Sequence, residues 1–415
     1  MRTKVLISLF TLVLLTTAAN SQWTEYDLPG TYGNSNDIVS VTNQIIFSAG
    51  HDIHKSTNGG INWVKQTNLA YENQRTEIQF YNSSTGWSCG ADGSFLKTTN
   101  GGTNWVETFA GFETLTGLDF INSNTGYLST ETGKVLKTTN GGSNWTSYSP
   151  SQISYLTSVF FLNDQTGWAS GSQGSTGKVI KTTNGGLNWV IQLNNVFNAV
   201  DHVYFRNAET GFAGCYKKMF RTTNGGNSWD TVNIHSDVND IKCVLMVSVT
   251  TGYATGSFFG NSGGVVKTFD GGLNWYLQWA GSPNSANSIS FAPGSTTTGW
   301  VSTNSGVLRT TNSGGELIGI QPVSNNIPEQ YELSQNYPNP FNPATNIKFQ
   351  IPESALVTLV VFDVTGREVA ELVNETLNAG EYKVDFNASG FTSGVYFYKL
   401  TSAGFTETKR MVLVK

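Results

Sequence analysis

The stretch KTTNGGSNW, residues 137–145, decides the fold because it returns at regular intervals along the chain. Other copies are KSTNGGINW (55–63), KTTNGGTNW (97–105), KTTNGGLNW (181–189), RTTNGGNSW (221–229) and KTFDGGLNW (267–275). A degenerate seventh copy, RTTNSGGEL (309–317), has Leu317 where a tryptophan is expected. Successive motif tryptophans are 40–46 residues apart, and that period is typical of β-propeller blades.

Each repeat also contains four short strand-like segments separated by glycine-rich turns. In the second repeat they are EIQFYN (77–82), STGWSCG (84–90), SFLKTT (94–99) and NWVETF (104–109). Four such segments make one blade, so the sequence predicts an all-β fold with a seven-bladed β-propeller over residues 22–320. A small immunoglobulin-like β-sandwich is expected to follow it.

The missing seventh tryptophan has a candidate replacement at the start of the chain. The segment QWTEYDL (22–28) resembles a fourth strand, and Trp23 precedes Ile38 by the same interval that separates Trp63 from Ile78. We therefore expect the N-terminal segment to complete the seventh blade, because an open ring would expose strand edges. The alternative is that residues 317–320 complete that blade.

Every motif residue has a mechanical reason to be there. Short Thr, Asn and Asp side chains hold tight turns, glycine accepts positive φ, and a tryptophan fills the space beneath the turn. We therefore interpret the motif as structural. Its key residues are Asn58, Asn100, Asn140, Asn184, Asn224 and Asp270, with Trp63, Trp105, Trp145, Trp189, Trp229 and Trp275. Because strands alternate in direction, the motif turns lie on the face opposite the 2–3 loops, and a ligand is expected at those loops.

These repeats resemble the Asp-box repeats of neuraminidase-type propellers, with asparagine mostly in place of aspartate. Together with the recurring Thr-Gly-aromatic element, for example at Trp87 and Trp168, they are similar to the photosystem II stability/assembly factor family. The resemblance implies a propeller fold and does not identify a ligand.

Composition and the N-terminus indicate export. Residues 1–21 have a basic start, an apolar run and small residues before a cleavage point, as in a secretory signal peptide. The net charge of −5 gives no basic excess for nucleic acid, and no other segment reaches the ~20 apolar residues of a membrane span. The three cysteines, Cys89, Cys215 and Cys243, give no disulfide framework.

The C-terminal region changes character. Residues 321–330 are predicted to be a linker, and six strand-like segments then indicate a β-sandwich over 331–415. The segments NYPNPFNP (336–343), DVTGREV (363–369), SGVYFYKL (393–400) and KRMVLVK (409–415) resemble the sorting domain of type IX secretion cargo. This resemblance implies a Bacteroidetes-like source, the type IX machinery as a partner, and release or attachment at the outer cell surface. A secreted protein would not meet a photosystem, so the assembly role is not transferred.

The function predicted is binding or adhesion, with a glycan or protein as ligand and a monomer as the expected state. Candidate binding residues on the loop face and channel mouth are Asp37, Tyr71, Arg75, Glu77, Tyr155, Asp201, His202, Asp240, Phe258 and Phe259. The alternative is a glycoside hydrolase or lyase on the same scaffold, which would use two of the carboxylates. No catalytic residue is assigned, and no cofactor or metal is expected, because no nucleophile motif, phosphate loop or metal-ligand cluster is evident.

Overall fold

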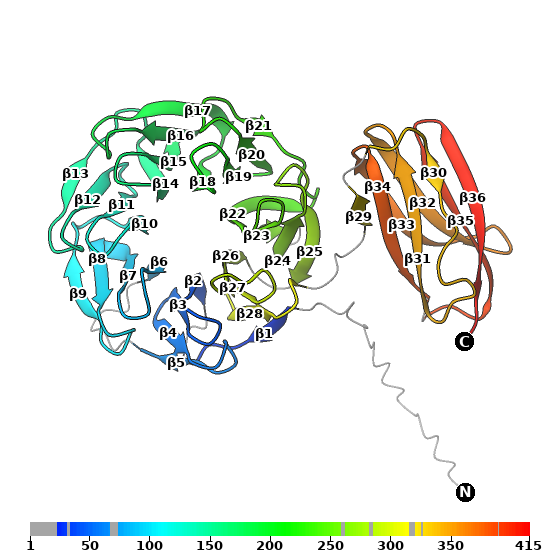
Figure 1. The fold of residues 1–415 in the computed structure, drawn as a ribbon, viewed down its shortest axis with the longest axis horizontal. Coiled ribbons are helices and arrows are strands. Elements are labelled where there is room, and N and C mark those ends of the chain that lie inside the picture. The colour runs from blue at the N-terminus through cyan, green and yellow to red at the C-terminus, as the bar shows by residue number, and fades with distance from the viewer. Residues whose placement is uncertain are drawn as a thin grey trace, which may run out of the picture.

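The repeats fold as seven four-stranded antiparallel sheets arranged in a ring, shown by the ribbon of the computed structural model (Figure 1). The structure describes residues 23–30, 34–66, 74–258, 262–281, 285–314, 320–324, 327–388 and 390–415. The predicted signal peptide lies outside these residues. Seven blades followed by a β-sandwich confirm the predicted fold class.

Each blade has four strands, which follow one another from the inner to the outer edge of the ring. Blade 1 has β2 (Ser35–Ser40), β3 (Ile46–Gly50), β4 (Ile53–Ser56) and β5 (Val64–Lys65). Blade 2 has β6 (Arg75–Phe80), β7 (Gly86–Gly90), the 3₁₀ turn η1 (Ala91–Gly93), β8 (Ser94–Thr98) and β9 (Val106–Phe109). Blade 3 has β10 (Leu115–Phe120), β11 (Gly126–Thr130), β12 (Val135–Thr138) and β13 (Thr146–Tyr148). Blade 4 has β14 (Tyr155–Phe161), β15 (Gly167–Gln173), β16 (Thr176–Thr182) and β17 (Val190–Phe197).

The remaining blades repeat this order. Blade 5 has β18 (Val200–Phe205), β19 (Gly211–Cys215), β20 (Lys218–Thr222) and β21 (Asp230–Thr231). Blade 6 has β22 (Val238–Met246), β23 (Gly252–Phe258), β24 (Ser262–Thr268) and β25 (Tyr276–Gly281). Blade 7 has β26 (Ala286–Phe291), β27 (Gly299–Thr303), β28 (Val307–Thr310) and, as its outer strand, β1 (Thr24–Tyr26).

The N-terminal strand closes the ring. β1 pairs antiparallel with β28, with Thr24 opposite Arg309 and Tyr26 opposite Val307. Trp23, just before β1, is only 4% exposed and lies in a core cluster with residues of blades 6 and 7. The predicted closure is confirmed. The alternative, in which residues 317–320 complete the blade, is wrong, because Ile320 pairs with the sandwich.

The repeated motif forms the turn between the third and fourth strands of a blade. In blade 3 the Thr138 hydroxyl donates to Asn140 Oδ1 (2.9 Å) and accepts the Gly142 N–H (3.0 Å). The same Asn140 oxygen accepts the Asn144 N–H at 2.9 Å. Gly142 has φ +91°, and a Cβ there would lie 2.3 Å from a ring carbon of Phe95 in the preceding blade. Positive φ and close approach therefore both require glycine.

A contact between neighbouring blades was not foreseen from the motif. In the first six copies, the basic residue that begins the motif reaches the motif turn of the next blade and donates to a backbone carbonyl at 2.7–3.2 Å. The pairs are Lys55 with Gly101, Lys97 with Gly141, Lys137 with Gly185, Lys181 with Gly225, Arg221 with Gly271 and Lys267 with Ser313. The motif thus holds one blade to the next as well as closing its own turn.

The C-terminal region is a sandwich of two four-stranded sheets. One has the order β29 (Ile320–Ser324), β34 (Gly380–Asn387), β31 (Ala344–Ile351) and β30 (Glu332–Leu333). The other has the order β33 (Glu368–Leu377), β32 (Ala355–Asp363), β35 (Gly394–Ser402) and β36 (Phe405–Leu413). The core between the sheets includes Phe349, Leu359 and Tyr398.

The structure differs from the predicted linker at one point. Residues 320–324 form the edge strand β29, whereas the sequence predicts that the propeller ends at 320 and that a linker begins at 321. The segment is short and contains Pro322, which cannot donate to a ladder and is therefore compatible with an edge strand. The short length of the segment and its proline explain why the sequence predicts a linker here.

Candidate functional site

All seven inner strands carry a β-bulge near their start. The register shifts fall between Ser35/Asp37, Arg75/Glu77, Leu115/Gly117, Leu156/Ser158, Val200/His202, Val238/Asp240 and Ala286/Ser288. A bulge inserts one extra residue and re-aims its side chain. The extra residues are Asn36, Thr76, Thr116, Thr157, Asp201, Asn239 and Asn287. The sequence thus places a polar side chain at the same point in every blade.

These extra residues build a cavity. All of them except Asn239 line a space of about 580 Å³, together with side chains that include Asp37, Gln74, Glu77, Tyr155, His202, Lys242 and Cys243. We call this the channel-mouth cavity. Its lining residues lie near the starts of the inner strands, whereas the motif turns follow the ends of the third strands. Because the first and third strands run in the same direction, the cavity opens on the face opposite the motif turns.

Several of these side chains connect adjacent blades. Asn36 donates to the Arg75 carbonyl at 2.6 Å, and Thr76 to the Leu115 carbonyl at 2.7 Å. Likewise, Thr157 donates to the Val200 carbonyl at 2.5 Å. Asn287 donates to the Ser35 carbonyl at 2.8 Å and so joins blade 7 to blade 1. Each of these groups donates to a backbone carbonyl of the next blade, so one of its roles is to hold the inner strands together.

Two predicted carboxylates, Asp37 and Glu77, meet at the cavity and are also bonded to backbone. Asp37 accepts the N–H of Ile38 and, across the blade boundary, that of Ile78, both at 2.8 Å. Glu77 accepts the Leu118 N–H of the next blade. Burial raises the pKa of both carboxyls, and the charge of Asp37 raises the pKa of Glu77 further.

His202 is neutral in its folded environment. Burial lowers the pKa of the imidazole to about 4. Its Nδ1 lies 3.3 Å from the Val244 backbone nitrogen, and accepting that N–H assigns the proton of the neutral ring to Nε2. The residue therefore acts as another link between inner strands, here from blade 5 to blade 6.

A second set of lining residues keeps its hydrogen-bonding capacity. Within the described residues, the side chains of Gln74, Tyr155, Asp201 and Lys242 form no hydrogen bond to the protein. Burial is the main cause that raises the pKa of Asp201 to about 6. The positive charge of Lys242 lowers this pKa, and the negative charge of Asp240 raises it. An amide, a phenol, a carboxylate and an ammonium thus remain available to a ligand.

Other predicted site residues lie elsewhere. Arg75 is 1% exposed and donates to Ser94 Oγ (2.5 Å) with Glu107 3.4 Å away, so the prediction that it binds ligand is wrong. Phe258 is 2% exposed and belongs to the core of blade 6, so that prediction is wrong too. Asp240 accepts the Ser257 hydroxyl at 2.8 Å. Tyr71 and Phe259 lie outside the described residues.

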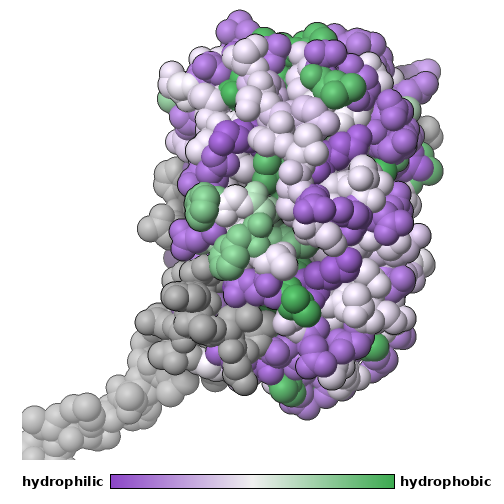
Figure 2. All heavy atoms as spheres, turned by 90° about the vertical axis from the view of Figure 1, so that its left-hand side faces the viewer, coloured by the Kyte–Doolittle hydropathy of each residue, from purple (hydrophilic) through white to green (hydrophobic). Residues whose placement is uncertain are grey.

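Exposed aromatic side chains lie on the connections of blades 2 to 5. The exposed fractions are 97% for Phe112, 74% for Phe197, 42% for Tyr155 and 37% for Tyr216. The Phe197 and Tyr216 rings meet edge to face at 6.4 Å. Figure 2 shows the outer side of the blades drawn on the left of Figure 1, where apolar side chains interrupt a mostly hydrophilic surface.

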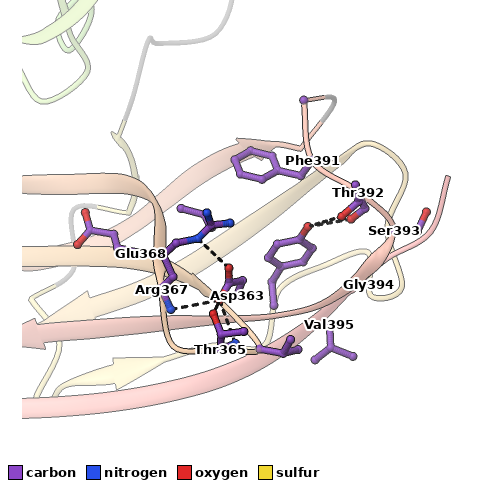
Figure 3. A pocket seen from close by; sticks show the side chains of 13 residues that line it. Asp363, Thr365, Arg367, Glu368, Phe391, Thr392, Ser393, Gly394 and Val395 are labelled. Atoms are coloured by element: carbon purple, nitrogen blue, oxygen red, sulfur yellow. Dashed lines mark hydrogen bonds and ion pairs between the residues drawn. The ribbon is translucent and has the colours of Figure 1, made fainter.

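The sandwich contains a separate open groove of about 670 Å³ (Figure 3). Its walls are residues 363–369 and 390–396, so the segments DVTGREV and SGVYFYKL meet there. Asp363 accepts hydrogen bonds from Thr365 and from Arg367 Nε (3.0 Å), and these bonds lower its pKa to about 2. The groove is thus framed by a tight, charge-assisted turn.

Two negative findings hold for the described residues. No group of three or more His, Cys, Asp and Glu side chains is arranged to hold a metal ion there. In the same part of the chain, no helix has the length and apolar character to cross a membrane.

The architecture defines a class: a closed seven-bladed propeller joined to a C-terminal β-sandwich. Residues 335–415 match the family described as a secretion system C-terminal sorting domain. Residues 55–153 match the family described as photosynthesis system II assembly factor YCF48. The chain therefore carries repeats of the YCF48 type and a type IX sorting domain, which directs it to the cell surface or the medium. The comparison with curated proteins gave no match.

Solved structures support the same fold. A structure of YCF48 bound to D1 peptide is 17% identical, with TM-score 0.58, covering 70% of this chain and 95% of that one. YCF48 from Cyanidioschyzon merolae is 18% identical, with TM-score 0.56 and 70% and 98% coverage. PorZ, a surface component of the type IX secretion system of Porphyromonas gingivalis, is 13% identical, with TM-score 0.53 and 94% and 60% coverage. At these identities the likeness concerns fold alone.

Proposed function

We propose that the protein is a secreted or surface-held binding protein, acting as a monomer, whose ligand lies in the channel-mouth cavity. The observation that carries this proposal is the repeated bulge, which turns polar side chains from six blades into one cavity. The cavity opens on the face that carries the irregular loops and exposed aromatic residues. Concave sites with a few converging polar groups are where ligands usually bind.

The available groups favour binding over hydrolysis. A glycosidase needs one carboxylic acid that gives a proton and a second carboxylate that acts as base or nucleophile. Here Asp37 and Glu77 each accept a backbone N–H from the next blade, which gives them a structural role. The second candidate, a glycoside hydrolase or lyase, is favoured by the raised pKa of Glu77, since a general acid must be protonated near the working pH.

The comparisons are compatible with a binding role. YCF48, whose propeller has the same fold, has been solved with a D1 peptide bound. A type IX sorting domain places the propeller outside the cell, where glycans and proteins of other cells are accessible. The D1 peptide is a ligand of YCF48. For this chain, the YCF48 structure supports only the general point that a propeller of this fold can bind a ligand.

The test compares the two faces of the propeller. The purified full chain would be screened on immobilised glycans and peptides, alongside Asp201→Asn in the cavity and Leu187→Ser, an exposed residue of a motif turn. We expect ligand binding to be weakened by the first variant only, with mass spectrometry finding no product from the bound ligand. Binding that depends on Leu187 and not on Asp201 would overturn the proposed site, and turnover would favour the hydrolase.

A further inference from the structure

The lining of the channel-mouth cavity divides into two sets by hydrogen bonding. The first set, which includes Asn36, Thr76 and Thr157, already donates to backbone carbonyls of neighbouring inner strands. The second set is Gln74, Tyr155, Asp201 and Lys242, which make no hydrogen bond within the described part of the chain. The second set can therefore offer its full side-chain hydrogen-bonding capacity to a ligand without breaking contacts that hold the ring.

The chemistry of this second set suits hydroxyl groups. A carboxylate such as Asp201 accepts from hydroxyl donors, and the Lys242 ammonium donates to hydroxyl or ether oxygens. The Gln74 amide can do both. Tyr155 offers a ring face as well as a phenol, and 42% of the residue is exposed at the rim. A polyhydroxylated ring would find acceptors, donors and an apolar surface in one space.

The charges on the cavity wall disfavour ionic ligands. The Asp201 carboxylate would repel a carboxylate or sulfate group on the ligand. A basic peptide would meet the Lys242 ammonium, while Asp37 and Glu77 are already engaged by backbone N–H groups. The Lys242 charge acts on Asp201, but no hydrogen bond or ion pair joins the two within the described residues, so their polar atoms stay available to a neutral partner.

The aromatic rim extends the surface beyond the cavity. Phe197 is the last residue of β17 and Asp201 is the second residue of β18, so both lie at the boundary of blades 4 and 5. Its exposed ring contacts Tyr216 from the adjacent hairpin. Stacked aromatic faces suit the C–H faces of sugar rings, so a chain of several sugars could reach from the cavity to this pair.

We infer that the channel-mouth cavity binds an uncharged oligosaccharide, with Asp201 and Lys242 as its main polar contacts and Phe197 and Tyr216 as an outer subsite. The inference rests on the proposed binding function and adds its ligand class. Asp201 is specified by its place in the bulge of blade 5, the one bulge in which the extra residue is a carboxylate.

Isothermal titration calorimetry on the full chain would test this inference. The probes are uncharged glucan and mannan hexasaccharides, an oligouronate and oligolysine. We expect binding to an uncharged hexasaccharide, weakened about tenfold or more by Asp201→Asn and by Lys242→Met, since hydrogen bonds to charged groups carry such factors. Phe197→Ala should weaken binding of the hexasaccharide but not of a disaccharide.

Matched controls are Asp230→Asn and Lys348→Met, exposed residues of the same types on β21 and β31, which should leave binding unchanged. Binding of only oligolysine or oligouronate, if weakened by Asp201→Asn, would overturn the ligand class and keep the cavity as the site. No binding by any probe, or hexasaccharide binding indifferent to Asp201 and Lys242, would overturn the inference itself. Unchanged tryptophan fluorescence would show that each variant is folded.

Discussion

Replacing Trp23 by alanine tests whether the N-terminal segment belongs to the propeller. The side chain is 4% exposed and lies against Gly314, where an added Cβ would be 2.4 Å from Trp23 Nε1. A buried aromatic of this size removes roughly 150–250 Å² from water, which at about 25 cal/mol per Å² gives an upper estimate of roughly 4–6 kcal/mol. Core Trp→Ala substitutions cost about 3–5 kcal/mol, and we expect a loss of that size in the free energy of unfolding.

The assay is urea unfolding followed by tryptophan fluorescence. All 11 tryptophans lie between residues 23 and 300, so the signal reports on the propeller and not on the sandwich. Trp63→Ala is the matched control, because Trp63 holds the same position in blade 1 and is 7% exposed. Equal losses in the two variants would support closure by the N-terminus. If Trp63→Ala were destabilising while Trp23→Ala changed the free energy by less than about 0.5 kcal/mol, the reasoning would be refuted.

Three further predictions concern charge and sorting. Glu107→Ala leaves the Arg75 guanidinium buried without its carboxylate partner and should lower the free energy of unfolding by about 3 kcal/mol in the same assay. Adding Arg75→Leu to this variant should restore most of the lost stability, and a double variant with no recovery would contradict the role of the pair. Burial raises the pKa of Asp119 to about 6, above its unfolded value, so the native state binds more protons at this carboxyl, and its contribution to propeller stability should rise as the pH falls from 7.5 to 5. Asp119→Asn should flatten that dependence, and an unchanged slope would assign it to other groups. A chain ending at residue 327 lacks the sorting domain and should remain in the periplasm in cell fractions; unchanged surface delivery would contradict its role.

The fold could be predicted from the sequence because the repeat signals it many times. One copy of Asn-Gly-Gly-x-x-Trp would indicate only a turn, but a fixed period with a missing last tryptophan indicated both the blade number and the closing strand. The edge strand β29 was missed because Pro322 and its polar neighbours resemble a linker. What identifies this segment as a strand is its partner, β34, which lies some 60 residues away.

The candidate site was predicted only in part. The starts of the inner strands predict Asp37, Glu77 and Asp201 near the channel mouth, and Tyr155 and His202 are also among the predicted binding residues. The structure brings all five to one cavity.

The bulges were missed, and with them Asn36, Thr76 and Asn287, because a bulge has no fixed sequence. A polar residue at the second or third position of every inner strand was the available signal. The prediction that Arg75 binds ligand was wrong because the residue before the bulge is buried. In most other blades this position is apolar, as with Leu115 and Leu156. The sequence of blade 2 alone does not show that Glu107 lies beside the buried Arg75 as its ion-pair partner.

The pairing of β1 with β28 also sets the order in which the molecule can be completed. Its two strands are about 285 residues apart, so closing the ring from a disordered chain carries an entropic cost on the order of 5 kcal/mol before any contact repays it. Blades that form earlier lower this cost by shortening the flexible path. The last blade therefore cannot mature until nearly the whole propeller has been delivered, and the segment following the predicted signal peptide is the part that waits longest for its partner.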